Sequence, residues 1–140
     1  MWKYDVEVDW TEDKKGEMRC AGKPSVEVAT PPEFGGPENI WTPEDLLTGS
    51  VATCIMTSTL FFTNRAGIEM HSYKSRAEGV LEKTRTGLAM TAITVEVSVV
   101  LKDAAQEDEL RKAVDMAEKS CPLSKSLNCP VELKLNVSAL

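Results

Sequence analysis

The sequence predicts a single α+β domain, residues 1–140, in which an antiparallel sheet packs on a long buried helix. Apolar and charged residues alternate near both ends of the chain and again over residues 91–101, as they do in half-buried strands. Residues 43–65 form a long apolar stretch that opens with strong helix-start signals. Strands therefore precede, separate and follow the helices without strict strand–helix alternation, which favours α+β over a parallel α/β sheet.

The first thirty residues predict a meander of three short strands. In the first strand, charged residues alternate with an apolar set that should be half-buried: Tyr4, Val6, Val8 and Trp10. Residues 17–21 and 25–30 are the next two strand candidates. Residues 31–43 then hold four prolines and the pair Gly35-Gly36, a composition that indicates a long ordered loop, and such loops are often functional.

The helix over residues 43–65 has the clearest signals in the chain. Thr42 is the expected N-cap, Pro43 takes the first helical position, and two acids occupy the first turn. The helix should end before Gly67. Apolar residues cover most of its surface, so we expect burial on most sides, and its many small residues indicate central packing rather than membrane insertion.

The second half of the chain predicts a hairpin, a surface helix and a final strand. Residues 68–84 and 91–101 pair across a turn at 85–87. Residues 103–119 carry one apolar stripe and charges elsewhere, as in an amphipathic helix that covers a sheet. A new turn begins at Cys121-Pro122, and alternation over 131–137 predicts the last strand.

Composition excludes several classes of protein. The chain is 42% hydrophobic with a formal net charge of −6, which suits one globular domain and disfavours nucleic acid or anionic membranes as partners. It has no apolar run of transmembrane length, and its first residues lack the order of a signal peptide. We therefore expect a cytoplasmic protein with no membrane partner.

The four cysteines lie far apart, at 20, 54, 121 and 129, without a C-x-x-C pair. This spacing disfavours a disulfide scaffold and a zinc site, and we expect no metal and no bound cofactor. Cys121 precedes Pro122, which favours a thiolate at a helix start. Cys54 lies too far along its helix for the dipole to lower its pKa, so it is either a core residue or a thiol activated by a distant cation. We expect Cys20 and Cys129 to serve packing, and we assign His71 no role.

Four segments, in order along nearly the whole chain, carry a family resemblance: Glu33-Phe34-Gly35-Gly36, Thr42-Pro43-Glu44-Asp45-Leu46-Leu47, Ala52-Thr53-Cys54 and Cys121-Pro122-Leu123-Ser124-Lys125-Ser126-Leu127. Together they resemble the OsmC and organic hydroperoxide resistance family. The resemblance implies an intertwined α+β homodimer with two buried central helices and two active sites at the subunit interface.

The resemblance also implies a thiol peroxidase that reduces organic hydroperoxides and, less efficiently, hydrogen peroxide. Cys54 would be the peroxidatic thiol and Cys121 the resolving one, so that a Cys54 sulfenic acid condenses to a Cys54–Cys121 disulfide. An external dithiol, for which the family suggests dihydrolipoyl groups, would reduce that disulfide. In the family a buried arginine keeps the peroxidatic sulfur ionised and a glutamate orients it; Glu44 matches the glutamate.

The arginine has more than one candidate in this sequence. Met18-Arg19-Cys20 looks like the corresponding stretch of one branch of the family, which makes Arg19 the first candidate. In the hydroperoxide resistance branch the arginine lies in a loop that aligns nearer Lys14 or Lys15. A lysine can ionise a thiol but lacks the fork that binds carboxylate and sulfur together.

Two other functions fit the sequence less well. One is a non-catalytic dimer of the same fold that binds a small hydrophobic ligand or acts as a redox switch, and the other is a plain thiol–disulfide oxidoreductase, disfavoured by the missing C-x-x-C. By analogy, a hydrophobic pocket would draw on six residues: Phe34, Ile40, Trp41, Met56, Phe61 and Phe62.

Overall fold

The computed structural model describes all of residues 1–140 and divides them into two compact units, Met1–Leu46 and Leu47–Leu140. The secondary structure is mixed α and β, as the sequence predicts, with three strands in each unit and the helices mostly in the second. The predicted α+β class is therefore confirmed.

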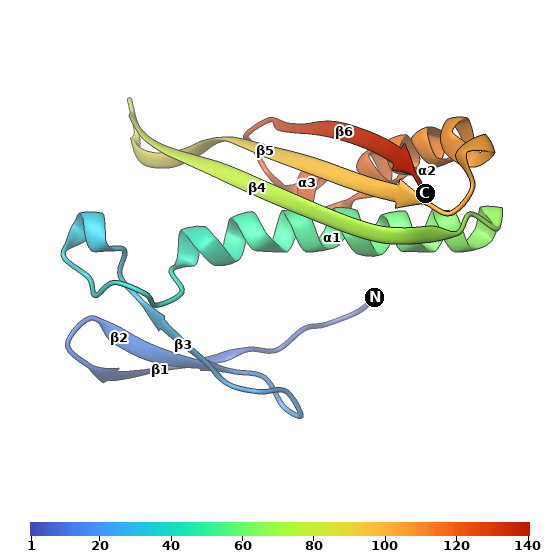
Figure 1. Ribbon diagram of the computed structural model, residues 1–140. Coiled ribbons are helices and arrows are strands. Elements are labelled where there is room, and N and C mark those ends of the chain that lie inside the picture. The colour runs from blue at the N-terminus through green and yellow to red at the C-terminus, as the bar shows by residue number, and fades with distance from the viewer. The chain divides into compact units, whose positions relative to one another are not determined.

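The first unit is a three-stranded antiparallel meander of β1 (Glu7–Glu12), β2 (Lys15–Arg19) and β3 (Val26–Ala29) (Figure 1). Gly16 of β2 faces Asp9 of β1 so closely that a Cβ atom at residue 16 would lie 2.6 Å from the Asp9 carbonyl oxygen. Only glycine allows the two backbones to approach in this way. A short 3-10 turn, Pro32–Phe34, interrupts the proline-rich loop that follows.

The prediction of a half-buried first strand is wrong for the chain by itself. Residues 1–6 lie outside any strand, and all six residues of β1 are exposed. Trp10 is 77% exposed, although it has the spacing of a buried position. Apolar and charged residues do alternate along β1, but no second layer of this unit covers the apolar face.

Helix α1 (Pro43–Ala66) begins where the sequence predicts, because its first turn is closed by two reciprocal hydrogen bonds. The Asp45 amide donates to the Thr42 hydroxyl at 3.1 Å, and the Thr42 amide donates to the Asp45 carboxylate at 3.0 Å. This arrangement satisfies amides that the helix itself leaves free.

Only one stripe of α1 is buried, at four-residue spacing: Val51, Ile55, Thr59 and Thr63. The expectation of burial on most sides is therefore wrong for the single chain, and side chains such as Phe61 are left exposed. By length and hydropathy alone α1 is one helix that would suffice to cross a membrane, a property that it shares with core helices of soluble proteins.

The second unit contains a mixed sheet in the order β4 (Met70–Thr84), β5 (Gly87–Leu101), β6 (Val131–Ala139) (Figure 1). β4 and β5 form the predicted long antiparallel hairpin. β6 pairs with β5 in parallel, which corrects the prediction of a purely antiparallel sheet. The connection between β5 and β6 runs through a 3-10 turn (Ala104–Gln106), α2 (Glu107–Ser120) and α3 (Pro122–Ser126). Parallel neighbours require such a crossover.

The core of the second unit lies on one face of β5, where alternate residues are buried: Ile93, Val95, Val97, Val99 and Leu101. α1 contributes Val51 and Ile55 to the same cluster, and α2 contributes Leu110 and Val114. The cluster also contains Cys121 and, at its edge, Cys54. Both thiols are thus fixed by the best-packed part of the chain.

Candidate functional site

Two cysteines from distant parts of the sequence meet in the second unit. Cys54 lies in the middle of α1, and Cys121 lies between α2 and α3. Both pack in the same hydrophobic cluster, and each thiol affects the pKa of the other. All four cysteines of the chain are free, so this pair is in the dithiol state.

Cys121 is the better stabilised thiolate of the pair. It is fully buried, and its sulfur caps α3 by accepting the Ser124 amide at 3.5 Å. Burial raises the pKa of the Cys121 thiol, but the neighbouring Ser124, Cys54 and Leu123 together outweigh it, so the pKa lies below its ordinary value. The predicted helix-start position of Cys121 is therefore confirmed in its geometry.

Cys54 has the opposite balance. Burial first, and the neighbouring Cys121 second, raise the pKa of the Cys54 thiol above its ordinary value. The Leu123 amide and Ser58 lower this pKa, but too little to offset the increase. No cation contributes, so an ionised Cys54 needs a positive charge beyond these neighbours.

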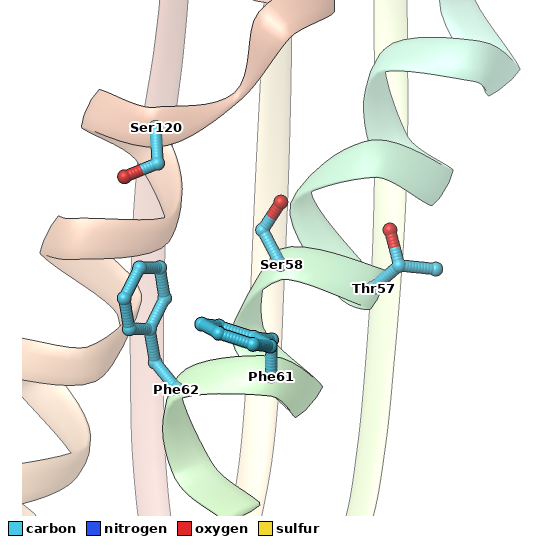
Figure 2. A pocket seen from close by; sticks show the side chains of 5 residues that line it. All are labelled: Thr57, Ser58, Phe61, Phe62 and Ser120. Carbon is cyan, nitrogen blue, oxygen red and sulfur yellow. The ribbon is translucent and has the colours of Figure 1, made fainter. Parts of the chain in front are cut away.

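A cavity of about 300 Å³ is lined by residues that neighbour the two cysteines along the chain (Figure 2). Ser58 is one helical turn beyond Cys54, and Ser120 directly precedes Cys121. The five lining residues are Thr57, Ser58, Phe61, Phe62 and Ser120. Phe61 and Phe62 pack edge to face with ring centroids 5.2 Å apart, so the cavity combines an aromatic wall with hydroxyl groups.

The first unit holds the other two predicted site residues. Glu44, in the first turn of α1, has its Oε2 atom buried without a hydrogen-bond partner. A buried, unpartnered carboxylate oxygen is costly, which favours a donor or cation at that point.

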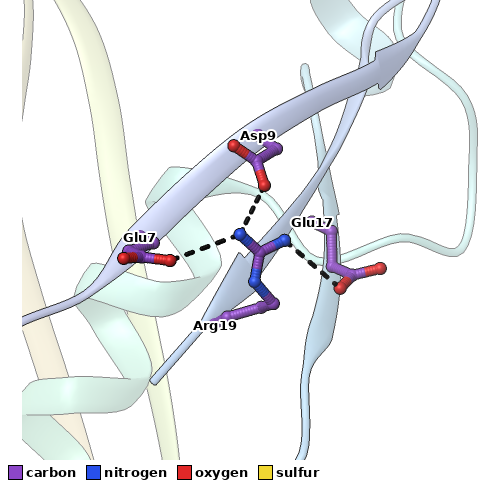
Figure 3. A network of polar contacts seen from close by, with 4 residues as sticks. All are labelled: Glu7, Asp9, Glu17 and Arg19. Carbon is purple, nitrogen blue, oxygen red and sulfur yellow. Dashed lines mark hydrogen bonds and ion pairs between the residues drawn. The ribbon is translucent and has the colours of Figure 1, made fainter. Parts of the chain in front are cut away.

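Arg19 forms ion pairs with strand carboxylates instead of with Glu44 (Figure 3). Its guanidinium lies 3.3 Å from Glu7, 2.5 Å from Asp9 and 3.7 Å from Glu17. The two lysine alternatives are also engaged: Lys14 donates to the Phe34 carbonyl at 3.4 Å, and Lys15 pairs with Glu12 at 3.5 Å.

The remaining sequence candidates lie elsewhere. His71 is exposed on β4, and Cys20 and Cys129 are half-buried. Of the six predicted pocket residues, only Phe61 and Phe62 line this cavity. Ser58 and Ser124 were not predicted from the sequence. Ser58 lies four residues after Cys54 and Ser124 three after Cys121, and these are the spacings at which a helix brings side chains together.

Comparisons with known proteins agree with this architecture. A family model described as OsmC-like protein matches residues 36–136. The uncharacterized protein YmaD of Bacillus subtilis (strain 168) is 31% identical over 114 residues, which cover 79% of this chain and 76% of that protein.

Solved structures match at lower sequence identity. An OsmC-like protein of unknown function from Vibrio cholerae superposes with a TM-score of 0.88 at 18% identity, over 96% of this chain and 99% of that chain. An organic hydroperoxide resistance protein OsmC from Legionella pneumophila superposes with a TM-score of 0.76 at 21% identity, over 99% and 98%. At these identities the superpositions establish the fold alone.

Proposed function

The chain belongs to the OsmC-like protein family, and from that premise we propose that it is a cysteine-based thiol peroxidase that reduces organic hydroperoxides and, less efficiently, hydrogen peroxide. The observation that carries the proposal is the packing of Cys54 and Cys121 in one cluster, near a cavity with an aromatic wall, with each thiol affecting the pKa of the other. A relative of the same fold is named as an organic hydroperoxide resistance protein.

The reaction has three balanced steps. The Cys54 thiolate attacks the terminal peroxide oxygen, the O–O bond breaks, and the leaving alkoxide takes a proton to become an alcohol, which leaves a sulfenic acid on Cys54. The Cys121 thiolate then attacks that sulfur and displaces hydroxide, which is protonated to water, to form the disulfide. An external dithiol, for which we propose dihydrolipoyl groups, restores both thiols and is itself oxidised.

The lowered pKa of Cys121 suits the second step. A resolving thiol has to be ionised when the sulfenic acid forms, and the Ser124 amide already supports that charge. Cys54 has to lose its proton for the first step, although burial raises its pKa. The proposal therefore requires a cation, and Arg19, held by Glu44, is the residue that we propose for it; Lys14 and Lys15 are the alternatives.

We also propose that two copies of the chain form an intertwined homodimer in the cytoplasm, each copy being one functional domain. The unburied sides of α1 and the exposed apolar residues of β1 support this proposal, because soluble proteins rarely leave such surface uncovered. Small residues on α1, among them Gly49 and Ala52, allow a second helix to approach closely.

The first experiment is a non-reducing peptide mass map after brief exposure of the reduced protein to stoichiometric cumene hydroperoxide. We expect a new Cys54–Cys121 linkage, and catalytic peroxide consumption with dithiothreitol that is lost in Cys54→Ser. Cys129→Ser is the matched control, since it removes a half-buried thiol outside the pair and should retain turnover.

Other outcomes contradict the proposal in distinct ways. Disulfide exchange without any need for peroxide would indicate a plain thiol–disulfide oxidoreductase. If both thiols stay free while Cys20 or Cys129 oxidises slowly, the peroxidase proposal is wrong, and the cavity beside Phe61 and Phe62 becomes the candidate site for a small hydrophobic ligand.

A further inference from the structure

The C-terminal part of α1 carries two aromatic rings and a cation close together. Phe61 and Phe62 line the cavity of about 300 Å³ and pack edge to face, with ring centroids 5.2 Å apart. Arg65 follows Phe61 by one helical turn, and its guanidinium carbon lies over the Phe61 ring, 5.7 Å from the ring centroid. The one basic residue of α1 therefore lies against a ring that forms part of the cavity wall.

Arg65 has no acidic partner within the chain. It takes part in none of the ion pairs, whereas Arg111 of α2 is paired with Glu107 at 3.1 Å. A guanidinium that lies over a ring uses its flat face for that contact, and its N–H donors, which lie in the plane of the group, stay available. The side chain is exposed, so its donors meet a ligand without the cost of burying an unpaired charge.

The cavity complements this cation with apolar surface and hydroxyl groups. The two rings supply the apolar part, Thr57, Ser58 and Ser120 supply the hydroxyls, and no acidic residue lines the cavity. Figure 2 shows the Phe62 ring reaching from α1 toward Ser120 at the end of α2. A volume of about 300 Å³ is at the lower end of the range for small-molecule sites and holds an aromatic ring with short substituents.

We propose that this cavity binds an apolar molecule that carries a negative charge at one end, with the apolar part against Phe61 and Phe62 and the charge held by Arg65. As a binding site it is independent of the chemistry of the thiols. As a preference among substrates it rests on the proposed function. There Arg65 is a specificity-determining residue, which favours hydroperoxides that bear a carboxylate over neutral ones of the same shape.

The test uses two probes of matched shape that contain no peroxide group. The carboxylate para-isopropylbenzoate and the neutral para-isopropylbenzyl alcohol share the ring and the isopropyl group and differ in charge. Isothermal titration calorimetry measures the binding of each probe to the full-length reduced protein. Arg65→Gln removes the charge but keeps a hydrogen-bond donor. Arg85→Gln is the matched control, because it changes the net charge equally at the turn between β4 and β5, with the whole of β4 between it and Arg65 (Figure 1).

We expect the benzoate to bind more tightly than the alcohol, and Arg65→Gln to weaken the benzoate about fivefold, the change that loss of an exposed ion pair makes at the strong end of its range. The alcohol should bind equally to both proteins, and Arg85→Gln should bind both probes as the unaltered protein does. Higher salt should weaken the benzoate alone, because salt screens exposed charges. Phe61→Leu should weaken both probes, since both pack against the ring.

The proposal is overturned if neither probe binds or if the two probes bind equally. It is also overturned if Arg85→Gln weakens the benzoate as much as Arg65→Gln does, which would indicate a general attraction of anions rather than a site.

Consumption of cumene hydroperoxide and of its para-carboxylate derivative separates this result from the fate of the proposed function. A KM that rises in Arg65→Gln for the carboxylate alone, with kcat unchanged, supports both proposals. Absence of consumption of either peroxide, with charge-selective binding of the probes intact, contradicts the peroxidase and leaves the binding site standing. Consumption of both peroxides, with probe binding that does not respond to Arg65→Gln, contradicts the role of Arg65 alone.

Discussion

Cys54 and Cys121 pack in the same cluster, yet their surroundings act on their pKa values in opposite directions. Cys121 accepts a hydrogen bond from the Ser124 amide, and its pKa is lowered, whereas burial is the largest effect on Cys54 and raises its pKa. In the reduced chain the first negative charge therefore belongs to Cys121. This is the charge that a resolving thiol needs, and it leaves the ionisation of Cys54 as the step that requires help.

The thiolate absorbance of the reduced protein, followed against pH, tests this order. Since the pKa of Cys121 lies below its ordinary value, its thiolate forms at lower pH than that of Cys54 and is lost only as the pH falls through that lowered value. We expect the step at lowest pH to vanish in Cys121→Ser. In Cys54→Ala the step should remain but move to higher pH, because the contribution of Cys54 to the lowered pKa of Cys121 is gone. Persistence of the acidic step in Cys121→Ser would contradict the assignment.

Arg19 is the residue whose predicted role depends most on the resemblance. If its guanidinium serves Cys54, Arg19→Ala should slow peroxide consumption at neutral pH about tenfold or more, because a nearby opposite charge lowers a thiol pKa by about one to three pH units. Arg19→Lys should restore only part of the rate, since lysine lacks the planar fork.

Thermal unfolding and the two lysines provide the controls for Arg19. The ion pairs of Arg19 with Glu7, Asp9 and Glu17 lie at the surface, so Arg19→Ala should change the melting temperature little. Lys14→Ala and Lys15→Ala should leave the rate unchanged. A loss of rate in Lys14→Ala or Lys15→Ala, with Arg19→Ala unaffected, would transfer the role to that lysine.

At the scale of single elements, the N-terminus of α1 carries both stability and a candidate site residue. Thr42 is buried, and its hydroxyl accepts the Asp45 amide. Thr42→Ala should lower the free energy of unfolding by about 1 kcal/mol, the usual loss for an N-cap, as measured by urea denaturation. Thr42→Ser keeps the oxygen and should lose much less. Equal losses in the two variants would indicate that the Thr42 methyl group, rather than the cap, stabilises the helix.

Elements with local signals were the ones that the sequence predicted well. Adjacent residues determine the cap at Thr42, the helix end at Gly67 and the turn at 85–87. These local signals predict α1 and the β4–β5 hairpin. The parallel pairing of β5 with β6 was missed because it depends on a crossover through α2, which alternation within a strand does not reveal.

The candidate site was predictable to a similar extent. The proximity of Cys54 and Cys121 came from a family resemblance, since nothing local to either residue indicates the other. The position of Ser58 in the cavity wall was not predicted, because a serine in an apolar helix has no distinctive pattern. The partner of Glu44 could not be derived because the charge that would meet it lies far away in the sequence.

At the scale of the whole molecule, the apolar surface that the single chain leaves uncovered requires an explanation. Trp2 is 86% exposed and Tyr4 is 87% exposed, and with Val6 they continue the two-residue period of β1 beyond its first residue. As a free tail, a segment with that period gains little free energy from burial, because its apolar face stays in water. It gains much as an added strand against a second copy, which would also account for the unburied sides of α1.

A homodimer predicts that the two faces of this N-terminal segment differ in their importance. Tyr4→Glu combined with Val6→Glu places charges on the apolar face and should shift the assembly toward monomer, because an unpaired charge buried at an interface is strongly unfavourable. Lys3→Glu combined with Asp5→Lys alters the opposite face at constant net charge and should leave the assembly unchanged.

Analytical ultracentrifugation should give the unaltered protein a mass twice the 15.4 kDa of the chain. Tryptophan emission should also shift to the red in the Tyr4→Glu, Val6→Glu variant, since Trp2 and Trp10 would return to water. If the unaltered protein has a sedimentation mass of 15.4 kDa at every concentration, the homodimer is wrong, and so is the placement of the active site between two subunits.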